Sequence, residues 1–305
     1  MTAISVALAT YNGARYIEPL LDSVRNQDWA DVRLVVSDDG STDGTRELVA
    51  RLWEDAAVHR NTAARGVIGN FSNAMTQAGG GYVALADQDD VWEPHKLSTL
   101  MGRMQACEAR HPGAPVLVFS DLKVVDATLN VIDHSFFGST SKSLQASGPQ
   151  DFLLSNHIPG CTMLLNDALL RLALPVPSEV MMHDWWLALV AASFGVVDSV
   201  DDPLVMYRQH GSNTVGAPTT EHWSALWRER LGKPMRGLQR CREQALLARN
   251  TLTAFRNRFG DTAPPAVQHI LRTMLDGRAA GRVRQIRHAR TGETAVKSAL
   301  VAAMM

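Results

Sequence analysis

Short apolar runs alternate with segments in which apolar residues recur every three or four positions through the first two thirds of the chain. Residues 4–9, 32–36, 83–86 and 116–119 are such runs, and each predicts a buried strand. Between the last two, residues 97–104 carry apolar side chains at the i, i+3, i+4 and i+7 spacing of one helix face. This alternation predicts an α/β fold with a mostly parallel central sheet flanked by helices.

After this α/β part the alternation stops. An apolar stripe over residues 238–259 steps by three and four positions and predicts a long helix. A pair of prolines then breaks the pattern, and a second helix is expected to run to about Arg290. We expect the stripe to pack on the α/β part or on a second copy of the chain, as a homodimer, and a membrane surface is the alternative. The chain is therefore divided into an α/β domain, residues 1–215, and a basic, mainly helical C-terminal region, residues 216–305.

The net charge of the whole chain is −1, but its two parts differ in sign. Residues 221–305 hold 16 Lys and Arg against 6 Asp and Glu, which leaves 14 against 25 in residues 1–220. A basic region beside an acidic body predicts an anionic surface as its partner. The region lacks the interleaved aromatic residues of a nucleic-acid groove, so we expect no nucleic acid, and an anionic membrane face fits better. A helical face that carries solvated arginines is the open alternative.

Cysteine usage and hydropathy indicate the cytoplasm. Cys107, Cys161 and Cys241 lie far apart without metal-ligand spacing, which is typical of a reduced compartment. No basic leader precedes the first strand, and no apolar run reaches the roughly 20 residues of a membrane-spanning helix. We expect a cytoplasmic protein, with peripheral contact at the inner face of the cell membrane as the alternative for its basic region.

Polar clusters follow three of the predicted strands at the point where each strand ends. They are Thr10–Gly13, Asp38–Thr45 and Asp87–Asp90. In a parallel sheet such ends meet at one edge, where α/β proteins bind their ligands. Neither a GxxxxGK[ST] nor a GxGxxG loop is present after the first strand, so carboxylates and a metal would have to hold a nucleotide here.

Asp87 and Asp89 are expected to converge, because side chains at i and i+2 of an extended backbone project to the same side. Two carboxylates that close repel each other unless a hard cation such as Mg²⁺ or Mn²⁺ joins them. The alternative is a polar loop that enters the next helix, with Asp90 as the N-cap. Spacing alone leaves both interpretations open.

Three stretches in this order together resemble the family 2 glycosyltransferases of the GT-A fold. They read TYNG from Thr10, SDDGSTDGT from Ser37 and ADQDDVW from Ala86, and they cover most of residues 1–105. The resemblance implies a GT-A-like nucleotide-diphospho-sugar transferase fold, a nucleotide-sugar donor and inversion at the anomeric centre. It also implies a divalent cofactor, Mg²⁺ or Mn²⁺.

Site residues carry over from this resemblance position by position. The implied nucleotide-binding residues are Thr10, Tyr11, Asn12, Asp39 and Asp87. Asp39 is expected to accept a hydrogen bond from the base, and Asp89 to contact the metal directly. Gly160 is expected close to the donor diphosphate and the acceptor.

The run His183-Asp-Trp-Trp begins a further predicted helix. On its own, Asp184 suits an N-cap or a partner of the helix macrodipole. Trp185 and Trp186 favour a sugar site, because flat rings pack on the C–H faces of a sugar while one carboxylate takes a hydroxyl proton. The run also matches the acidic catalytic motif of the resembling family, which makes Asp184 the expected general base, with both tryptophans near donor and acceptor.

A predicted strand over residues 204–207 leads to Arg208 and His210, which should point to one side by the same i, i+2 rule. A lone histidine is more often an ordinary hydrogen-bonding residue than a ligand. The resemblance favours His210 as a ligand of the metal, and Arg208 would neutralise phosphate. The motifs HDWW and YRQHG are closest to bacterial rhamnosyltransferase-like members, which makes rhamnose a candidate sugar.

Two further segments have competing interpretations. Asp121 follows the strand at 116–119 and either touches the acceptor or holds a turn, with the turn favoured. Residues 133–150 are rich in Ser and Gly and are expected to form a mobile surface loop over the site.

The sequence therefore predicts an inverting, metal-dependent glycosyltransferase that moves a sugar from a dTDP- or UDP-sugar to a hydroxyl of a surface-polysaccharide or lipid-linked glycan. One alternative is a nucleotidyltransferase, which would usually carry a glycine- and basic-rich loop after the first strand. Another is a non-catalytic nucleotide-sugar-binding or scaffold protein of the same fold, in which the acids would be lost.

Overall fold

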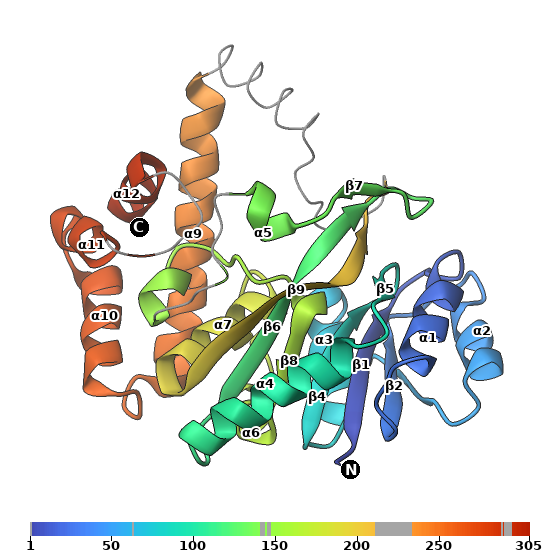
Figure 1. Cartoon of the computed structure of the whole chain (residues 1–305). Coiled ribbons are helices and arrows are strands. Elements are labelled where there is room, and N and C mark those ends of the chain that lie inside the picture. The colour runs from blue at the N-terminus through green and yellow to red at the C-terminus, as the bar shows by residue number, and fades with distance from the viewer. Residues whose placement is uncertain are drawn as a thin grey trace.

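The computed structural model describes residues 2–62, 64–140, 144, 148–210, 234–287, 289 and 295–305 (Figure 1). Its strands are β1 (Ile4–Thr10), β2 (Val32–Asp38), β3 (Ala57–Arg60), β4 (Tyr82–Asp87), β5 (Val91–Trp92), β6 (Val116–Val125), β7 (Val131–Asp133), β8 (Met163–Leu165) and β9 (Val196–Arg208). Its helices are α1 (Ile17–Arg25), α2 (Thr45–Leu52), α3 (Val67–Gln77), α4 (Lys96–Arg110), α5 (Phe136–Ser139), α6 (Asp167–Ala173), α7 (His183–Phe194), α9 (Pro234–Phe259), α10 (Pro265–Asp276), α11 (Ala279–Gln285) and α12 (Ala295–Met304). Two 3₁₀ turns are η1 (Pro149–Phe152) and η2 (Gly160–Thr162).

One sheet runs through the molecule in the order β3-β2-β1-β4-β8-β6-β9-β5, with β7 paired to β6. Strands β3, β2, β1 and β4 are parallel to one another. Within them Thr10 pairs with Asp38 and Ala9 pairs with Asp87, so the three central strands end level with one another. This register brings the three polar clusters to one edge of the sheet, as the sequence pattern predicted.

The other half of the sheet is mixed. β8 is antiparallel to both of its neighbours, β4 and β6, whereas β6 and β9 are parallel. Parallel neighbours need a crossover connection, usually a helix, whereas the described residues between β6 and β8 form β7, the short helix α5 and two 3₁₀ turns. The predicted α/β fold with helices flanking a central sheet is confirmed, and the departure from parallel pairing is local to β8, β5 and β7.

Buried apolar positions explain how the helices attach to the sheet. The predicted stripe of α4 is confirmed, since Leu97, Leu100, Met101 and Met104 are each at most 1 % exposed. α4 contacts β6 and β9 in front of the sheet as drawn in Figure 1, while α7 contacts the same strands from behind. α3 contacts α7 and also β1 and β2, so the starts of α3 and α7 both reach the polar edge.

Strand β6 is longer than the apolar run that predicted it, because it pairs with β9 along most of its length. Asp121 therefore lies within β6 and is 2 % exposed, so the expectation that it follows the strand is wrong. Its carboxylate accepts a hydrogen bond from the Phe137 amide at 3.2 Å and another from the Ser135 hydroxyl. Asp121 thus holds the start of α5, which agrees with the favoured turn-holding interpretation.

The segment 133–150 contains regular secondary structure. It contains α5 and the first residues of η1. Residues 141–143 and 145–147 lie outside the described part of the chain, so the expected mobility stays a prediction.

Most described residues of the C-terminal region belong to α9, α10, α11 and α12. The long helix predicted over 238–259 is confirmed as α9, but the expected second helix is interrupted at Gly277 and forms α10 and α11. The boundary at residue 215 lies outside the described residues, so the division into two regions stays a prediction. None of the described helices combines the length and the apolar character that crossing a bilayer requires.

The apolar stripe of α9 packs on α7. Phe255 is 0 % exposed, with ring centroids 5.9 Å from Trp186 and 6.0 Å from Phe194. Phe259 lies 5.0 Å from Phe194 in the same cluster. Burial of one such side chain contributes about 1.5–3 kcal/mol. Of the partners considered for the stripe, the α/β part is therefore the one it contacts, and these side chains are not exposed to a membrane.

Candidate active site

A cavity of about 980 Å³ opens at the carboxyl ends of β1, β2 and β4, where the sequence pattern predicted ligand binding. The starts of α3 and α7, residues 154–160 and one face of α9 also line it. This volume is typical of a small-molecule or cofactor site. The predicted site residues that line it are Thr10, Tyr11, Asn12, Asp39, Asp87, Asp89, Gly160, Asp184, Trp185 and His210.

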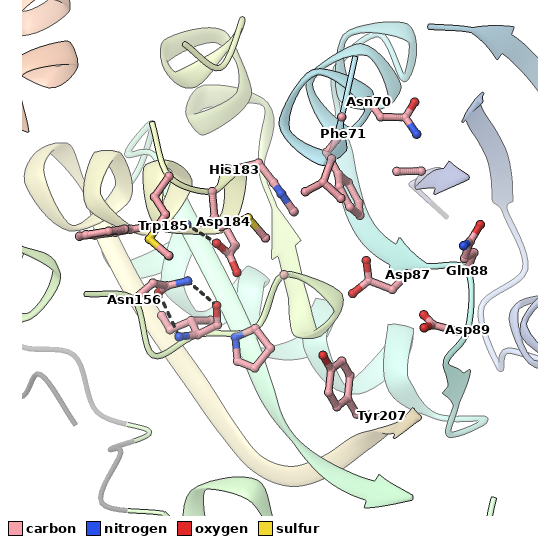
Figure 2. Close-up of a pocket in the computed structure, with 18 of the residues that line it drawn as sticks. Asn70, Phe71, Asp87, Gln88, Asp89, Asn156, His183, Asp184, Trp185 and Tyr207 are labelled. Atoms are coloured by element: carbon pink, nitrogen blue, oxygen red, sulfur yellow. Dashed lines mark hydrogen bonds between the residues drawn. The ribbon is translucent and has the colours of Figure 1, made fainter. Parts of the chain in front are cut away.

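The acid loop, Asp87 to Asp90, follows β4. Figure 2 shows the carboxylates of Asp87 and Asp89 at the cavity. Asp90 is 0 % exposed, and its carboxylate accepts the backbone N–H of Arg208 at 3.1 Å. The interpretation of Asp90 as a helix cap is wrong, because β5 separates it from α4, which begins at Lys96.

Negative charge is concentrated at the end of β4. Burial raises the pKa of Asp87 to about 7, and the charges on Asp89 and Asp184 contribute to the same shift. Lys96 opposes the shift with its positive charge. Carboxylates crowded at one wall of a cavity form a set of hard oxygen ligands whose repulsion a divalent cation relieves. The donor set therefore fits Mg²⁺ or Mn²⁺.

Lys96 is a buried cation beneath the acid loop that sequence reasoning missed. It is 0 % exposed, its Nζ donates to the Cys161 carbonyl at 2.6 Å, and it lies 3.4 Å from the centroid of the Trp92 ring. Burial lowers its pKa to about 7, against the raising effect of Asp90 and Asp87. A lysine in the first turn of a helix usually faces solvent, and no sequence signal marks this one as different.

Asp87 also belongs to a second, deeper cluster. Its ligand atom, that of Asp90 and the Cys161 sulfur lie within 4.8 Å of one another. Burial raises the pKa of the Cys161 thiol, which keeps it protonated, and the Lys96 ammonium donates to the backbone carbonyl of the same residue. Asp87 therefore lies between this buried cluster and the charge of Asp89.

Pairing of β5 with β9 brings the end of β9 to the acid loop. There the Nε2 of His210 lies 2.7 Å from the Oδ2 of Asp89. The His210 ring stacks on Tyr16 with 4.6 Å between centroids. The two residues expected to contact a metal, far apart in sequence, are thus neighbours at the cavity wall.

Arg208 does not take the place expected for it. It is 4 % exposed, and its guanidinium donates to the carbonyl oxygens of Asp89 at 2.7 Å and Ala127 at 2.8 Å. It lies behind the acid loop because Arg208 still belongs to β9, where its backbone pairs with Val125. The expectation that Arg208 faces the phosphates is corrected to a role in fixing the backbone of the acid loop.

Asp38 and Asp39 differ in burial and in their hydrogen-bond partners. Asp38 is buried and accepts the Thr10 hydroxyl at 2.9 Å, so the side-chain hydroxyl of Thr10 is directed at the turn after β2. Asp39 lines the cavity and accepts hydrogen bonds from the Asn61 amide at 2.9 Å and the Gly66 N–H at 2.7 Å. These bonds hold the Asp39 carboxylate at the wall where the resemblance implied a nucleobase.

Gln88 was missed in the sequence and holds the loop after β1. Its side-chain amide accepts the Tyr11 N–H at 2.9 Å and donates to the Tyr11 carbonyl at 3.0 Å. A Cβ at Gly13 would lie 2.1 Å from the Gln88 amide oxygen, which explains the glycine there. The alternation that places Asp87 and Asp89 on one side puts Gln88 on the other, and this signal could have found it.

Asn12 turns the loop after β1 rather than extending it. Its φ of 48° lies in the left-handed region, which asparagine tolerates better than most residues. Its side-chain oxygen accepts the Thr42 N–H at 2.9 Å. Asn12 therefore links the loops after β1 and β2, and Tyr11, 57 % exposed, projects from this linked edge.

Asp184 lies in the first turn of α7, and its carboxylate accepts the Trp185 N–H at 2.6 Å. Met182 is the N-cap, so the N-cap interpretation of Asp184 is wrong, while its position remains favourable for the helix macrodipole. Figure 2 shows Asp184 and Asp87 approaching the cavity from opposite sides. This arrangement leaves space for a substrate between two carboxylates.

The two tryptophans face different surroundings. Trp185 lines the cavity with a buried indole whose Nε1 donates to the Phe152 carbonyl at 2.6 Å. Trp186 is 0 % exposed, donates to the Ala173 carbonyl at 2.8 Å and packs against Phe255. Its expected place beside the sugar is wrong, because successive residues of a helix point about 100° apart and only one of the two can face the cavity.

Sequence reasoning also missed the contribution of α9 to the wall. Arg240, Glu243, Gln244 and Leu247 line the cavity. Gln244 also donates to the Leu154 carbonyl at 3.3 Å, which ties α9 to the loop before η2. These four residues occur at i, i+3, i+4 and i+7, so a search for a polar face beside the apolar stripe would have found them.

The fold and the site define an α/β protein whose ligand cavity is built from carboxylates at the ends of parallel strands. The family model for glycosyl transferase family 2 matches residues 5–168, which is more than half of the chain. The protein therefore belongs to glycosyl transferase family 2, a family of enzymes.

Curated relatives support this assignment. An uncharacterized glycosyltransferase of Nostoc sp. is 28 % identical over 221 residues, 69 % of this chain and 66 % of that protein. A dTDP-rhamnosyl transferase of Shigella flexneri is 26 % identical over 230 residues, 69 % and 74 % of the two chains. A GalNAc(5)-diNAcBac-PP-undecaprenol beta-1,3-glucosyltransferase of Campylobacter jejuni is 36 % identical over 106 residues, 33 % and 34 %. The aligned part is thus less than two thirds of the Nostoc and Campylobacter proteins.

Solved structures confirm the fold. S. aureus TarS 1–349 in complex with UDP has a TM-score of 0.54 at 19 % identity, covering 99 % of this chain and 89 % of that chain. A mannosyltransferase from Pyrobaculum calidifontis in complex with GDP-Man and Mn²⁺ has a TM-score of 0.55 at 19 % identity, covering 95 % and 74 %. The GT-A-like fold with its C-terminal helices is therefore shared with glycosyltransferases of distant sequence.

Proposed function

We propose that the protein is an inverting, metal-dependent glycosyltransferase that moves a sugar from a nucleotide sugar to a hydroxyl of a glycan or lipid-linked acceptor. One observation carries the proposal: Asp87, Asp89 and His210 line one side of a single cavity, and Asp184 lines the other. Family membership supports the reaction class, and this opposed placement supports a single displacement.

Nucleotide binding is assigned to the edge formed by the loops after β1 and β2. Asp39 is held there by Asn61 and Gly66, and accepts a hydrogen bond from the base. The exposed ring of Tyr11 packs on the nucleoside, and Thr10 and Asn12 shape the loop that presents it. We propose a dTDP- or UDP-sugar as the donor, and the S. flexneri relative, a dTDP-rhamnosyl transferase, supports the first of these.

Asp87, Asp89 and His210 would hold Mg²⁺ or Mn²⁺. The crowding that raises the pKa of Asp87 supports this assignment, as does the Mn²⁺ in the Pyrobaculum mannosyltransferase complex. When bound, the cation supplies positive charge against the negative charge that develops on the departing diphosphate.

Asp184 acts as the general base. Its carboxylate accepts the proton of the acceptor hydroxyl while that oxygen attacks the anomeric carbon from the face opposite the diphosphate. One C–O bond forms as the bond to the diphosphate breaks, so the configuration inverts. The hydrogen bond from Trp185 orients the carboxylate, and the walls of the cavity hold the two reactants together.

Sugar and acceptor are proposed from the relatives and from the wall of the cavity. The S. flexneri relative is a dTDP-rhamnosyl transferase, which supports rhamnose as a candidate sugar. The C. jejuni relative has an undecaprenol-linked glycan in its name, which supports a lipid-linked or surface-polysaccharide acceptor. Arg240 and Gln244 of α9 also line the cavity, and we assign them to the binding of that acceptor. Membrane contact and homodimer formation stay predictions.

The first test measures thermal stabilisation by UDP, dTDP and their sugars, with Mn²⁺ or with EDTA. We expect stabilisation with Mn²⁺, because a ligand at 100 times its Kd adds about 2.7 kcal/mol to the free energy of unfolding. In Asp89→Ala the part of the stabilisation that depends on Mn²⁺ should be lost. Release of free nucleotide from a nucleotide sugar then separates an enzyme from a binding protein.

Asp276→Ala is the control, because this carboxylate lies on α10 and pairs with Arg256 away from the cavity. It should keep the wild-type response to nucleotide and Mn²⁺. Stabilisation that is equal in Mn²⁺ and EDTA would remove the metal from the proposal, and absence of any response to nucleotides and nucleotide sugars would remove the function itself.

A further inference from the structure

His183 is the first residue of α7 and directly precedes Asp184. It is 3 % exposed, and its imidazole lines the cavity. The ring stacks on Phe71 of α3, with 3.9 Å between ring centroids and 16° between the planes. Neither ring nitrogen has a hydrogen-bond partner among the residues that the structure describes.

An unpaired polar group at this depth is unusual in a folded protein, because it gives up its hydrogen bonds to water without replacement. The stack on Phe71 needs only a flat ring, and phenylalanine would supply one without that loss. The two nitrogens of His183 therefore indicate a partner that enters the cavity from outside the chain.

Gly160 keeps the edge of this imidazole accessible. A Cβ at Gly160 would lie 2.9 Å from the Nε2 of His183. Because the ring is already packed against Phe71, it has little freedom to move away from a side chain at position 160. A residue larger than glycine would therefore cover or displace the nitrogen.

The charge state of His183 restricts the chemistry of the partner. Burial lowers the pKa of His183 to about 3, so the imidazole is neutral at pH 7. A neutral imidazole presents one N–H donor and one lone-pair acceptor. Hydroxyl groups both donate and accept, whereas the oxygens of a phosphate dianion only accept. A ligand that carries hydroxyl groups matches both nitrogens.

The position of His183 identifies which hydroxyl groups these are. Figure 2 shows His183 between Phe71 and Asp184, with Asp87 across the cavity. In the proposed reaction the donor sugar lies between the diphosphate, at Asp87, and the base, at Asp184. We propose that His183 binds hydroxyl groups of the donor sugar and so selects among nucleotide sugars, an inference that rests on the proposed function.

The test compares UDP-glucose, UDP-GlcNAc and dTDP-rhamnose with free UDP and dTDP, by calorimetric titration in Mn²⁺. His183→Phe keeps the stack and removes both nitrogens, so we expect an unchanged or higher melting temperature. The variant should bind the free nucleotide within about two-fold of wild type and the preferred nucleotide sugar about 10-fold more weakly, the effect of one lost hydrogen bond.

His269→Phe is the control for the exchange of an imidazole for a phenyl ring. His269 is exposed on α10 and does not line the cavity. It should leave the ratio of nucleotide-sugar to nucleotide affinity unchanged. His183→Gln, which keeps a donor and an acceptor, should recover part of the sugar affinity. His183→Leu, which has neither, replaces His183→Phe as the test if that variant does not fold.

Equal weakening of nucleotide and nucleotide sugar would overturn the inference, since His183 would then act on the nucleotide or on the shape of the cavity. Unchanged donor affinity with loss of transfer would also overturn it, by assigning His183 to the acceptor. Both results leave the proposed function intact. If wild type binds none of the nucleotide sugars in Mn²⁺, the proposed function and the inference fail together.

Discussion

Among single residues, Asp184 carries the proton transfer of the proposed reaction, and its place on α7 separates that role from nucleotide binding. The carboxylate lies across the cavity from the acid loop. Asp184→Asn keeps the shape of the side chain and removes its basicity. We expect the turnover number to fall about 100-fold or more, the usual contribution of a general base, with nucleotide affinity unchanged.

Steady-state kinetics with the preferred nucleotide sugar measure this effect, and titration with the free nucleotide measures affinity. Asp167→Asn is the control, because it makes the same exchange in the first turn of another helix, α6, outside the cavity wall. It should retain wild-type turnover. Wild-type turnover in Asp184→Asn would assign the base to another residue.

Asp87 gives the folded protein a pH dependence of definite sign. Its pKa is about 7 in the folded state, against 3.8 as the ordinary value in an unfolded chain. Between these values the unfolded chain has lost this proton while the folded chain keeps it, so stability falls as the pH rises. In metal-free buffer, Asp87→Asn should therefore become more stable relative to wild type on going from pH 5 to pH 8, as measured by urea unfolding.

Asp126→Asn is the control for the pH series. This exposed carboxylate accepts hydrogen bonds from Asn130 and Thr128, which lower its pKa to about 2. Asp126 has lost its proton by pH 5, so the difference in the free energy of unfolding between Asp126→Asn and wild type should be the same at pH 5 and pH 8. If the difference in the free energy of unfolding between Asp87→Asn and wild type is also independent of pH, the raised pKa of Asp87 is contradicted.

At the scale of elements, α9 joins the C-terminal region to the catalytic cavity. Its apolar stripe packs on α7, and its polar face reaches the cavity with Arg240 and Gln244. α7 in turn carries Asp184 at its start. The packing between these two helices therefore fixes the distance between the proposed base and the proposed acceptor wall.

Phe255→Ala tests this packing. Phe255 is 0 % exposed and contacts Trp186 and Phe194, so its truncation should lower the free energy of unfolding by about 3–5 kcal/mol, the range for large-to-small changes in a core. Urea unfolding measures the loss. Leu246→Ala on the same helix is the control, because Leu246 is 60 % exposed and its truncation should change stability by less than about 0.5 kcal/mol.

A loss in Phe255→Ala no larger than in the control would mean that α9 does not share the core of the α/β part. With the expected loss, donor hydrolysis should persist in the remaining folded protein while transfer to the acceptor weakens. The reason is that Arg240 and Gln244 are on the destabilised helix, whereas the acid loop is on the sheet.

Across the whole molecule, patterns local in sequence gave the elements and the edge of the sheet. The apolar run before Asp87 and the stripe after Lys96 each predicted an element that the structure contains. Parallel strands place their carboxyl ends at one edge of the sheet, so Thr10, Asp38 and Asp87 were expected to lie close together. In the structure Thr10 pairs with Asp38, and Ala9, the residue before Thr10, pairs with Asp87. These inferences needed only side-chain period and chain direction.

Errors arose where a side chain's surroundings depend on segments distant in sequence. Trp186 was expected beside a sugar and lies in the core, because α9 packs on that face of α7. Arg208 was expected at phosphates and instead binds the carbonyl of Asp89, because β5 pairs with β9. Lys96 lies in the first turn of α4, where a lysine usually faces solvent. It is buried because residues distant in sequence, Cys161 among them, pack around it.

The sequence by itself determined the alternation of strands and helices around the sheet, the edge at which polar residues gather, and the acids that line a site there. Tertiary structure alone decided that His210 contacts Asp89, that Asp184 faces Asp87 across the cavity, and that α9 supplies part of the wall. The physical reason is that backbone period and apolar spacing act over a few residues, whereas burial, hydrogen-bond partners and pKa are set by whichever elements pack together.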